Sequence, residues 1–190
     1  MVDVVPRALT ADLVGRVFVA APLPPEIRFV LAERVADLPI PGKVGPPENW
    51  HVTLRFLDTI DRVTYERFLH GLERVGSQFS FPIALHDFGA FPNSRKATVF
   101  WAGIGRGSDD VSLLNEIAED SAIGAGLLPE ERPFHPHLTL ARIRPHADVR
   151  PLLDEELDLG WRCDHIVVYR SHLGRGPARY EPLDSIDLIG

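Results

Sequence analysis

The chain has 190 residues, of which 45% are hydrophobic and 25% charged, and its formal net charge is −7. A chain of this size and composition can bury a core of its own, as ordinary globular proteins do. The negative charge argues against a protein that coats long nucleic acids, because such a protein needs many cationic contacts with phosphates. A small cationic pocket for one or two phosphates remains compatible with it.

Features of targeting and redox chemistry favour a cytoplasmic protein. No run approaches the ~18 apolar residues that a membrane span needs, and the N-terminus through Ala21 lacks the basic leader of a signal peptide. Cys163 is the single cysteine, which excludes an intramolecular disulfide and suits a reducing compartment. Asp164 beside it would raise rather than lower the thiol pKa. We therefore interpret Cys163 as a buried or bystander thiol.

The pattern of apolar residues, prolines and glycines predicts interspersed strands and helices. In chain order we expect a strand at 15–21, a helix whose apolar face carries Ile27, Val30, Leu31, Val35 and Leu38, and an irregular loop at 39–47. Next come a strand at 49–57, a helix at 61–75, strands at 80–88 and 97–104, and a helix at 110–123. The last part contains a strand at 135–143, a weakly helical segment at 147–157, and strands at 164–170 and 179–188.

Two tetrapeptides in this layout have the same form. His51-Val52-Thr53-Leu54 and His137-Leu138-Thr139-Leu140 both read His-apolar-Thr-Leu, and each lies early in a predicted strand. This weak internal repeat is consistent with two α/β lobes related by a pseudo-twofold axis.

The repeated motif has a direct chemical reading. Side chains alternate along a strand, so His51 and Thr53 share one face, as do His137 and Thr139. Two such strands side by side would line one cleft with two imidazoles and two hydroxyls. One imidazole can take a proton from an attacking oxygen while the other gives one to a leaving oxygen, and the hydroxyls can bind phosphate oxygens. One His-x-Thr is common by chance, whereas a matched pair favours catalysis.

The motifs belong to a longer set of matching segments. These are Arg16 to Ala20 with Leu23-Pro24, then 49–57 (NWHVTLRFL), 100–103 (FWAG), 134–142 (FHPHLTLAR), 169–173 (YRSHL) and 178–180 (ARY). Through them the chain resembles the LigT-like branch of the 2H phosphoesterases, the RNA 2′,3′-cyclic phosphodiesterase family, over nearly its whole length. The run HPHLTLAR is highly specific. One departure is Asp58, where the family usually has glycine, and we expect a turn there.

The resemblance implies an α+β fold with two pseudo-symmetric lobes, each with an antiparallel sheet and flanking helices, around a central cleft. Residues 1–190 would form this single bilobal domain, which we expect to be a monomer. The implied activity opens 2′,3′-cyclic phosphates of RNA 3′ ends or nucleosides to 2′-phosphomonoesters, without a metal or other cofactor. Some relatives also join RNA ends 2′–5′ in the reverse direction.

The same resemblance assigns the second-motif histidine as base toward water and the first as acid toward the leaving 3′ oxygen. Those roles would fall to His137 and His51, although the two motifs are chemically equivalent and leave the direction open. Arg142 matches the family's phosphate-contacting arginine. Strict alternation turns it away from His137, so the strand must end or bulge near Ala141 for Arg142 to reach the cleft.

Further candidates each have two readings. Arg55 shares the predicted face of His51, so it binds phosphate or is a surface arginine. Phe18 stacks on the terminal base, as an aromatic residue does in relatives, or packs in the core. His135 lies two residues before the motif histidine, and we interpret it as a second-shell or entrance residue. Arginines and one lysine of the second half could contact the RNA backbone or simply be solvated: Arg95, Lys96, Arg144, Arg150, Arg170, Arg175 and Arg179.

Three alternatives remain for the whole protein. His51, His135 and His137 could form a zinc site, because His-x-His is a ligand spacing found on strands, but this leaves both threonines unexplained. A non-catalytic module that binds RNA ends would retain binding without turnover. Other 2H enzymes act on small cyclic nucleotides or on 2′–5′ oligonucleotides, which the sequence does not exclude.

Overall fold

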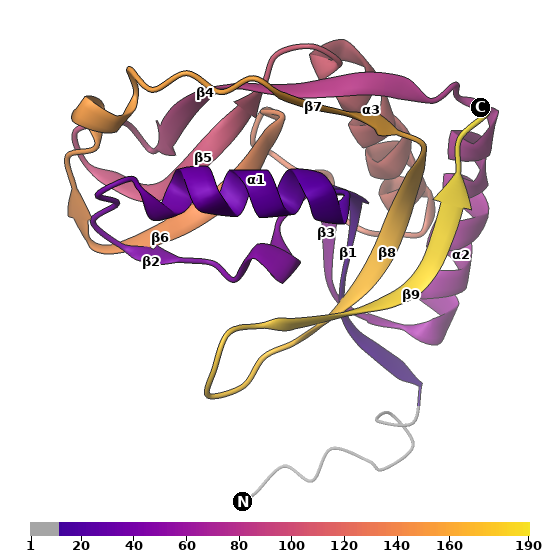
Figure 1. Cartoon of the computed structure of the whole chain (residues 1–190). Helices are drawn as coiled ribbons and strands as arrows, with labels where there is room; N and C mark the ends of the chain where they lie inside the picture. Colours follow the sequence, from indigo (N-terminus) through magenta and orange to yellow (C-terminus); the bar gives the residue numbers. More distant parts are fainter. Residues whose placement is uncertain (1–11) are drawn as a thin grey trace, which may run out of the picture.

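The computed structural model describes residues 12–190 (Figure 1). Residues 1–11, which the predicted domain includes, lie outside the described part. The helices are α1 (Pro25–Ala36), α2 (Arg62–Leu72) and α3 (Ser108–Gly124), with 3-10 turns at Pro47–Asn49, Glu73–Ser77 and Arg150–Leu152. The strands are β1 (Leu13–Pro22), β2 (Lys43–Val44), β3 (His51–Asp61), β4 (Phe81–Phe91), β5 (Ala97–Ile104), β6 (His137–Ala147), β7 (Leu159–Cys163), β8 (His165–His172) and β9 (Arg179–Asp187).

These strands form one sheet in the order β7-β4-β5-β6-β3-β1-β8-β9, with β2 paired to β6. Each of these strand pairs is antiparallel. The sheet divides into a first lobe (β1, β3, β8 and β9) and a second lobe (β2 and β4 to β7). The two lobes meet at one register pair, Val52 opposite Leu138. The predicted α+β fold with an antiparallel sheet is confirmed.

The helices are distributed unequally over this sheet. Helices α2 and α3 pack against each other and against β3 of the first lobe, whereas α1 contacts β7 of the second lobe (Figure 1). Helix α2 is capped at its N-terminus by Asp61, whose side chain accepts a hydrogen bond from the Thr64 N–H at 2.8 Å. Among residues 12–190, no helix has the length and apolarity needed to cross a bilayer.

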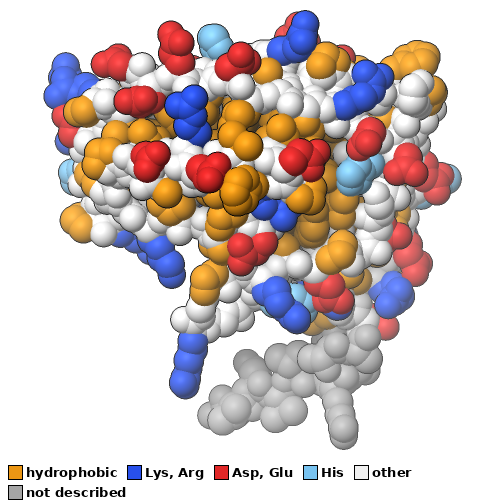
Figure 2. Space-filling view, in the orientation of Figure 1, with side chains coloured by type: hydrophobic (Ala, Val, Ile, Leu, Met, Phe, Trp, Pro, Cys, Tyr) orange, Lys and Arg blue, Asp and Glu red, His pale blue; other side chains and the backbone are white. Residues whose placement is uncertain are grey.

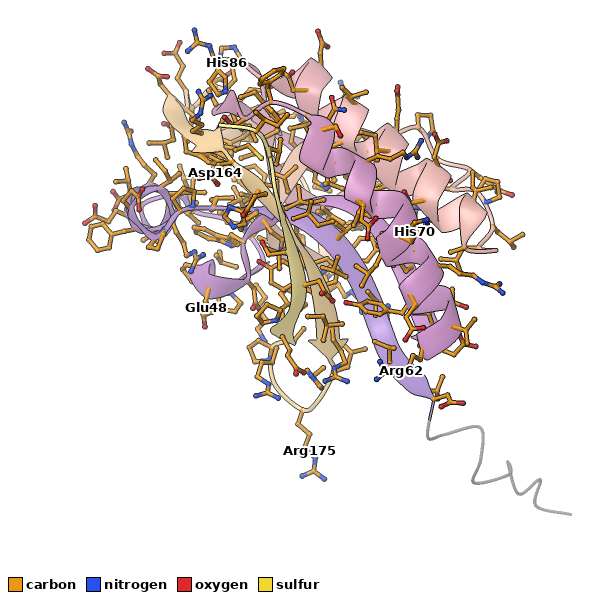
Figure 3. All side chains as sticks on the ribbon, turned by 90° about the vertical axis from the view of Figure 1, so that its right-hand side faces the viewer. Glu48, Arg62, His70, His86, Asp164 and Arg175 are labelled. Atoms are coloured by element: carbon orange, nitrogen blue, oxygen red, sulfur yellow. The ribbon has the colours of Figure 1, made fainter. Side chains whose placement is uncertain are left out.

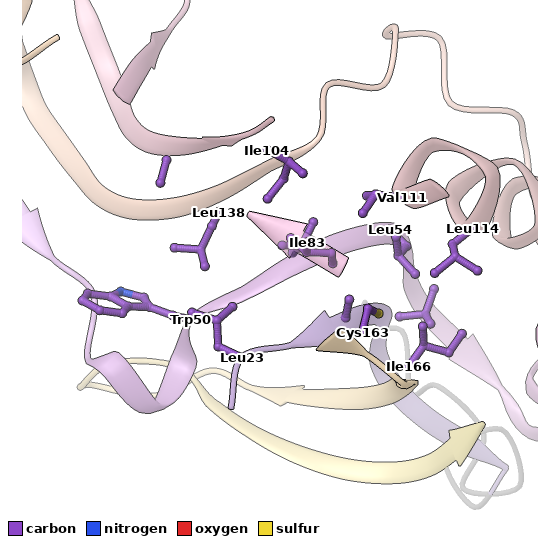
Figure 4. Packing of buried hydrophobic residues seen from close by; sticks show 14 of the residues in the cluster. Leu23, Trp50, Leu54, Ile83, Ile104, Val111, Leu114, Leu138, Cys163 and Ile166 are labelled. Atoms are coloured by element: carbon purple, nitrogen blue, oxygen red, sulfur yellow. The ribbon is translucent and has the colours of Figure 1, made fainter. Parts of the chain in front are cut away.

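One apolar cluster runs through both lobes and holds them together. Leu54 and Leu114 join β3 to α3, while Ile83 and Ile166 bring in β4 and β8 (Figure 4). Burying each such side chain stabilises the fold by about 1.5–3 kcal/mol relative to leaving it exposed. Cys163 belongs to the same cluster, and burial raises the pKa of its thiol to about 12, with the charge of Asp164 adding to the effect. The interpretation of Cys163 as a buried thiol is confirmed.

The predicted elements differ from the observed ones mainly in the second lobe. The segment 147–157 was expected to be weakly helical, but only Arg150–Leu152 makes a 3-10 turn, and strand β7 follows it. In β7, Trp161 and Cys163 are buried while Gly160 and Arg162 are exposed. This alternation covers only five residues, which is too short to predict a strand from the sequence. Strand β2 has only two residues, so no periodicity could indicate it.

Asp58 has an unusual backbone conformation, one that accounts for the glycine usual at this position in the family it resembles. It is the one non-glycine residue with positive φ among residues 12–190, at 55°. The expected turn is wrong, because Asp58 lies inside β3, next to a register shift between the Val17–Asp58 and Phe18–Phe56 pairs. Left-handed backbone favours glycine and is tolerated by aspartate better than by most residues.

Gly at position 58 should therefore be more stable than Ala, which reverses the usual order in a strand. We expect Asp58→Gly to exceed Asp58→Ala by about 1 kcal/mol in the free energy of unfolding, measured with urea. At the neighbouring Thr59 the order should be normal, with Ala above Gly by about 0.5–1 kcal/mol. The same order at both positions would contradict the left-handed assignment.

Candidate functional site

Both repeated motifs lie at the register pair that joins β3 of the first lobe to β6 of the second. Val52 and Leu138 are register partners, and continuing that antiparallel register by one residue places His51 opposite Thr139 and Thr53 opposite His137. All four polar side chains then share one face of the sheet, while Val52 and Leu138 are fully buried on the other. The two histidines occupy diagonal positions, which lie about 7–8 Å apart. One phosphate group can span that distance.

Both imidazoles are held in the same tautomer. The Nδ1 of His51 lies 2.8 Å from the carbonyl oxygen of Asn49, and the Nδ1 of His137 lies 2.7 Å from the carbonyl oxygen of His135. A carbonyl can only accept, so each Nδ1 carries the proton and donates it. Each Nε2 is therefore free to take or give a proton when the ring changes charge. The contact of His135 with His137 Nδ1 is made by its backbone carbonyl.

The two imidazoles are packed among different aromatic side chains. His51 stacks on Phe18 with ring centroids 4.8 Å apart and meets the edge of Tyr180 at 5.3 Å. His137 meets Phe91 edge-on at 5.0 Å and lies 6.0 Å from Trp101. This packing holds both rings in place and covers part of their surface.

Burial lowers both histidine pKa values. The pKa of His51 falls to about 4, mainly because burial disfavours the charged ring, with a smaller effect from the positive charge of His137. The pKa of His137 is also lowered by burial, and the neighbouring His135 adds to this. The effect of His137 on His51 agrees with the two rings lying in one site. Without an anion between them, both rings are therefore biased toward the neutral form.

Phe18 has a different environment from the one that base stacking requires. It is only 1% exposed, and its ring is covered by His51, Tyr169 and Tyr180. Stacking of a nucleobase on Phe18 would require these rings to move aside. In this structure Phe18 supports the imidazole of His51, which corresponds to the core-packing alternative.

Arg142 reaches the face of the histidines because β6 contains a bulge. Trp101 pairs with Thr139 but the preceding Phe100 pairs with Ala141, so one extra residue, Leu140, is inserted in β6. Leu140 and Ala141 are both buried, and Arg142 is exposed beyond them. Of the two conditions under which Arg142 could reach the cleft, an end of the strand or a bulge near Ala141, the structure has the bulge. It returns Arg142 to the face that carries His137 and Thr139.

A matching bulge in β3 has the opposite effect on Arg55. Ala20 pairs with Thr53 and Val19 with Arg55, so Leu54 and Arg55 both turn away from the face of His51. Arg55 forms an ion pair with Glu119 of α3, and its guanidinium also donates to the carbonyl of Leu128 at 2.7 Å. The prediction that Arg55 binds phosphate is wrong, because strict alternation did not anticipate the bulge.

A cavity of about 250 Å³ opens beside this face. His51, Thr53 and Thr139 line it, and Arg142 lies at the same cavity. His137 does not line this cavity and lies diagonally across the strand pair from His51. Sequence reasoning missed Phe56, Tyr180 and Lys43, which also line the cavity. Phe56 could have been found, because it follows His51 by the same five residues that separate Arg142 from His137.

The β8–β9 hairpin closes one side of the cavity through Pro177, Ala178 and Tyr180. The side-chain amide of Asn49 donates to the Ala178 carbonyl at 2.6 Å, which ties this hairpin to the residue that orients His51. Arg175 projects from the hairpin tip, away from the rest of the molecule (Figure 3). Within the described residues, no group of three His, Cys, Asp or Glu side chains is arranged to hold a metal ion.

A curled antiparallel sheet that brings two histidines and two threonines to one face is an arrangement that suits a phosphoesterase. Residues 45–175 match the 2'-5' RNA ligase superfamily. The chain is 31% identical over 171 residues to the RNA 2',3'-cyclic phosphodiesterase of Escherichia coli, covering 88% of this chain and 93% of that protein. It is 30% identical over 174 residues to the RNA 2',3'-cyclic phosphodiesterase of Methanocaldococcus jannaschii, covering 87% and 96%.

Solved structures are similar over the same extent. The crystal structure of E. coli LigT in its apo form covers 94% of this chain and 99% of that chain, with a TM-score of 0.80 and 27% identity. That of TT0787 from Thermus thermophilus covers 92% and 98%, with a TM-score of 0.78 and 25% identity. The chain belongs to the 2'-5' RNA ligase superfamily, as a LigT-like 2H phosphoesterase.

The two arginines should separate stability from activity. In the Arg55–Glu119 pair the side chains are only 10% and 22% exposed, so Arg55→Met leaves a largely buried carboxylate unpaired. We expect it to lower the free energy of unfolding by roughly 1–3 kcal/mol, below the cost of breaking a fully buried pair. Arg142→Met is the matched comparison, and it should lower kcat/KM while leaving the urea midpoint nearly unchanged. A loss of activity without a loss of stability in Arg55→Met would return Arg55 to the phosphate site.

Proposed function

We propose that this protein hydrolyses 2′,3′-cyclic phosphates at RNA 3′ ends to 2′-phosphomonoesters, with His51 and His137 as the acid–base pair. The observation that carries the proposal is the placement of both imidazoles on one face, each with Nδ1 bound to a backbone carbonyl and Nε2 free. The names of the relatives, RNA 2',3'-cyclic phosphodiesterase, support this substrate class.

In the proposed reaction, water attacks phosphorus and the bond from phosphorus to the 3′ oxygen breaks. One neutral imidazole takes the proton from the water, and one protonated imidazole gives a proton to the 3′ oxygen. We assign these roles to His137 and His51, following the resemblance described above. At the end of the reaction the proton has moved from one ring to the other, so a proton exchange with solvent restores the starting state.

The neighbouring groups suit the charge that develops on the phosphate. Thr53 and Thr139 can donate hydroxyl hydrogen bonds to non-bridging oxygens, and Arg142 can offset the growing negative charge. Phe56 is 52% exposed at the cavity, so its ring can stack on the terminal base without any rearrangement. We propose Phe56, instead of Phe18, for that contact.

A second activity follows from the family description. The same two imidazoles can catalyse a transesterification, in which the 5′ hydroxyl of a second RNA attacks phosphorus in place of water, the bond from phosphorus to the 3′ oxygen breaks, and a 2′–5′ linkage forms. The match to the 2'-5' RNA ligase superfamily favours testing it. We further propose that the protein acts as a monomer, because one chain supplies every residue of the site. A cytoplasmic location stays a prediction.

Single replacements of the histidines test the proposal most simply. His51→Ala and His137→Ala should each lower kcat on a nucleoside 2′,3′-cyclic phosphate by about 10² to 10⁴, the usual contribution of a positioned acid or base. The double variant should lose far less than the product of both losses, since the two residues act as one unit. Circular dichroism checks that the variants fold. Full activity in either single variant would refute the assignment.

The pH dependence follows from the lowered pKa values. The reactive form holds one proton on the pair, so kcat/KM should be bell-shaped. Because burial lowers both histidine pKa values in the free enzyme, the maximum of kcat/KM should lie below pH ~6.5, the usual imidazole value. Bound phosphate stabilises the imidazolium, so the kcat profile should move to higher pH.

Rates measured with and without chelator provide the control for this profile. A zinc-bound hydroxide would make activity rise with pH to a plateau and vanish on chelation. A plateau at high pH together with sensitivity to chelator would contradict the two-histidine mechanism.

A further inference from the structure

Lysine is rare in this chain, and one of its two lysines lies at the cavity. The sequence contains 18 arginines but only Lys43 and Lys96. Lys43 lines the cavity together with His51 and Arg142, whereas Lys96 lies in the turn between β4 and β5. The two residues are both exposed, so they form a matched pair for a test.

The position of Lys43 is fixed by the short strand β2. Lys43 is the register partner of Arg142 on β6, so both side chains point to the face that carries the histidines. The backbones approach closely here: a Cβ at Gly42 would lie 2.7 Å from the Arg142 carbonyl oxygen. Glycine at position 42 is therefore required for β2 to pair, and pairing keeps Lys43 one strand spacing, about 4.8 Å, from Arg142.

Within residues 12–190, the positive charges of Lys43 and Arg142 have no ion-pair partner. Arg150 and Arg170 form ion pairs with Asp148 and Glu181. No carboxylate is recorded within ion-pair distance of Lys43 or Arg142 among residues 12–190. Figure 2 shows acidic and basic side chains interspersed over the face in view, with basic side chains projecting along its lower edge. On a chain of net charge −7, two adjacent unpaired cations beside a catalytic cavity indicate a site for an anion.

The site holds two cationic side chains, Lys43 and Arg142, whereas one cyclic phosphate carries a single negative charge. Between Thr139 and Arg142 lie two regular strand steps besides the bulge, about 7 Å, so Arg142 can reach back toward the histidines. Strand β5 occupies one edge of β6 beside Arg142, so β2 pairs with the other edge, the one that also pairs with β3. Lys43 therefore lies beside Arg142 on the same face, within the cavity that His51 also lines. A second phosphate, one nucleotide away from the first, would fall beside Lys43.

We infer that Lys43 binds the phosphodiester on the 5′ side of the terminal nucleotide, which makes an RNA chain a better substrate than a single nucleoside cyclic phosphate. This inference rests on the proposed function, because it presumes that the cyclic phosphate lies at the two histidines. It assigns separate tasks to the two cations, with Arg142 at the reacting phosphate and Lys43 at its neighbour.

The test removes one charge from the substrate and one from the protein. Three substrates are compared by kcat/KM: a nucleoside 2′,3′-cyclic phosphate, a dinucleotide with the same end, and that dinucleotide with an uncharged methylphosphonate as its internal linkage. A 2′-O-methyl group on the first nucleoside of both dinucleotides prevents internal cleavage. The proteins are the wild type, Lys43→Gln, Lys43→Arg and the control Lys96→Gln.

The wild type should prefer the phosphodiester over the methylphosphonate by about 2–5-fold, the effect of one solvated phosphate contact. This ratio should fall to about 1 in Lys43→Gln and stay near the wild-type value in Lys43→Arg and Lys96→Gln.

Two results would overturn the inference alone: a wild-type ratio near 1, or equal slowing of both dinucleotides in Lys43→Gln. The wild-type ratio needs no variant, so a folding defect cannot obscure it. No turnover of any of the three substrates would overturn the proposed function, and the inference with it.

Discussion

The site depends on one antiparallel contact, the pairing of Val52 with Leu138. Each of these residues is fully buried, and each is followed and preceded by polar residues that must therefore point to the open face. Because the pairing is antiparallel and both motifs meet at their second residue, the two histidines are related by a pseudo-twofold axis. A shift of this register by one residue would move the polar side chains of one motif to the buried face. The packing of both lobes into one apolar cluster holds the register in place.

Each lobe has a bulge at the same position after its histidine, but the residue that the bulge brings to the open face differs between the lobes. An extra residue at Leu54 in β3 and at Leu140 in β6 brings the fifth residue after each histidine back to the open face. In the first lobe that residue is the aromatic Phe56, and in the second it is the cationic Arg142. The symmetric scaffold thus becomes an asymmetric site, which suits a nucleotide with a base on one side and phosphates on the other.

Much of the site could be predicted because it depends on local patterns. The two His-x-Thr-Leu motifs, their strands and the face they share follow from period-two alternation. Strict alternation turns Arg142 away from His137, so the sequence indicated that Arg142 could reach the cleft only if the strand ended or bulged near Ala141. Arg55 was misplaced because an identical bulge occurs in β3 and nothing in its local sequence reports the partner strand. Phe18 was ambiguous for another reason, since its burial depends on Tyr169 and Tyr180, which are distant in sequence. Lys43 could not be found at all, because β2 exists only through its pairing with β6.

The central claim is that His51 and His137 form one electrostatically coupled pair, each with a free Nε2. A titration of ¹⁵N-labelled histidine by NMR, in the wild type and in His137→Gln, tests it most directly. The account predicts that both rings carry their proton on Nδ1 when neutral, and that the pKa of His51 is about 4 in the wild type. It also predicts a higher pKa of His51 in His137→Gln, because the variant removes a positive charge that disfavours protonation. A His51 that titrates near pH ~6.5 and does not respond to the replacement of His137 would contradict the account.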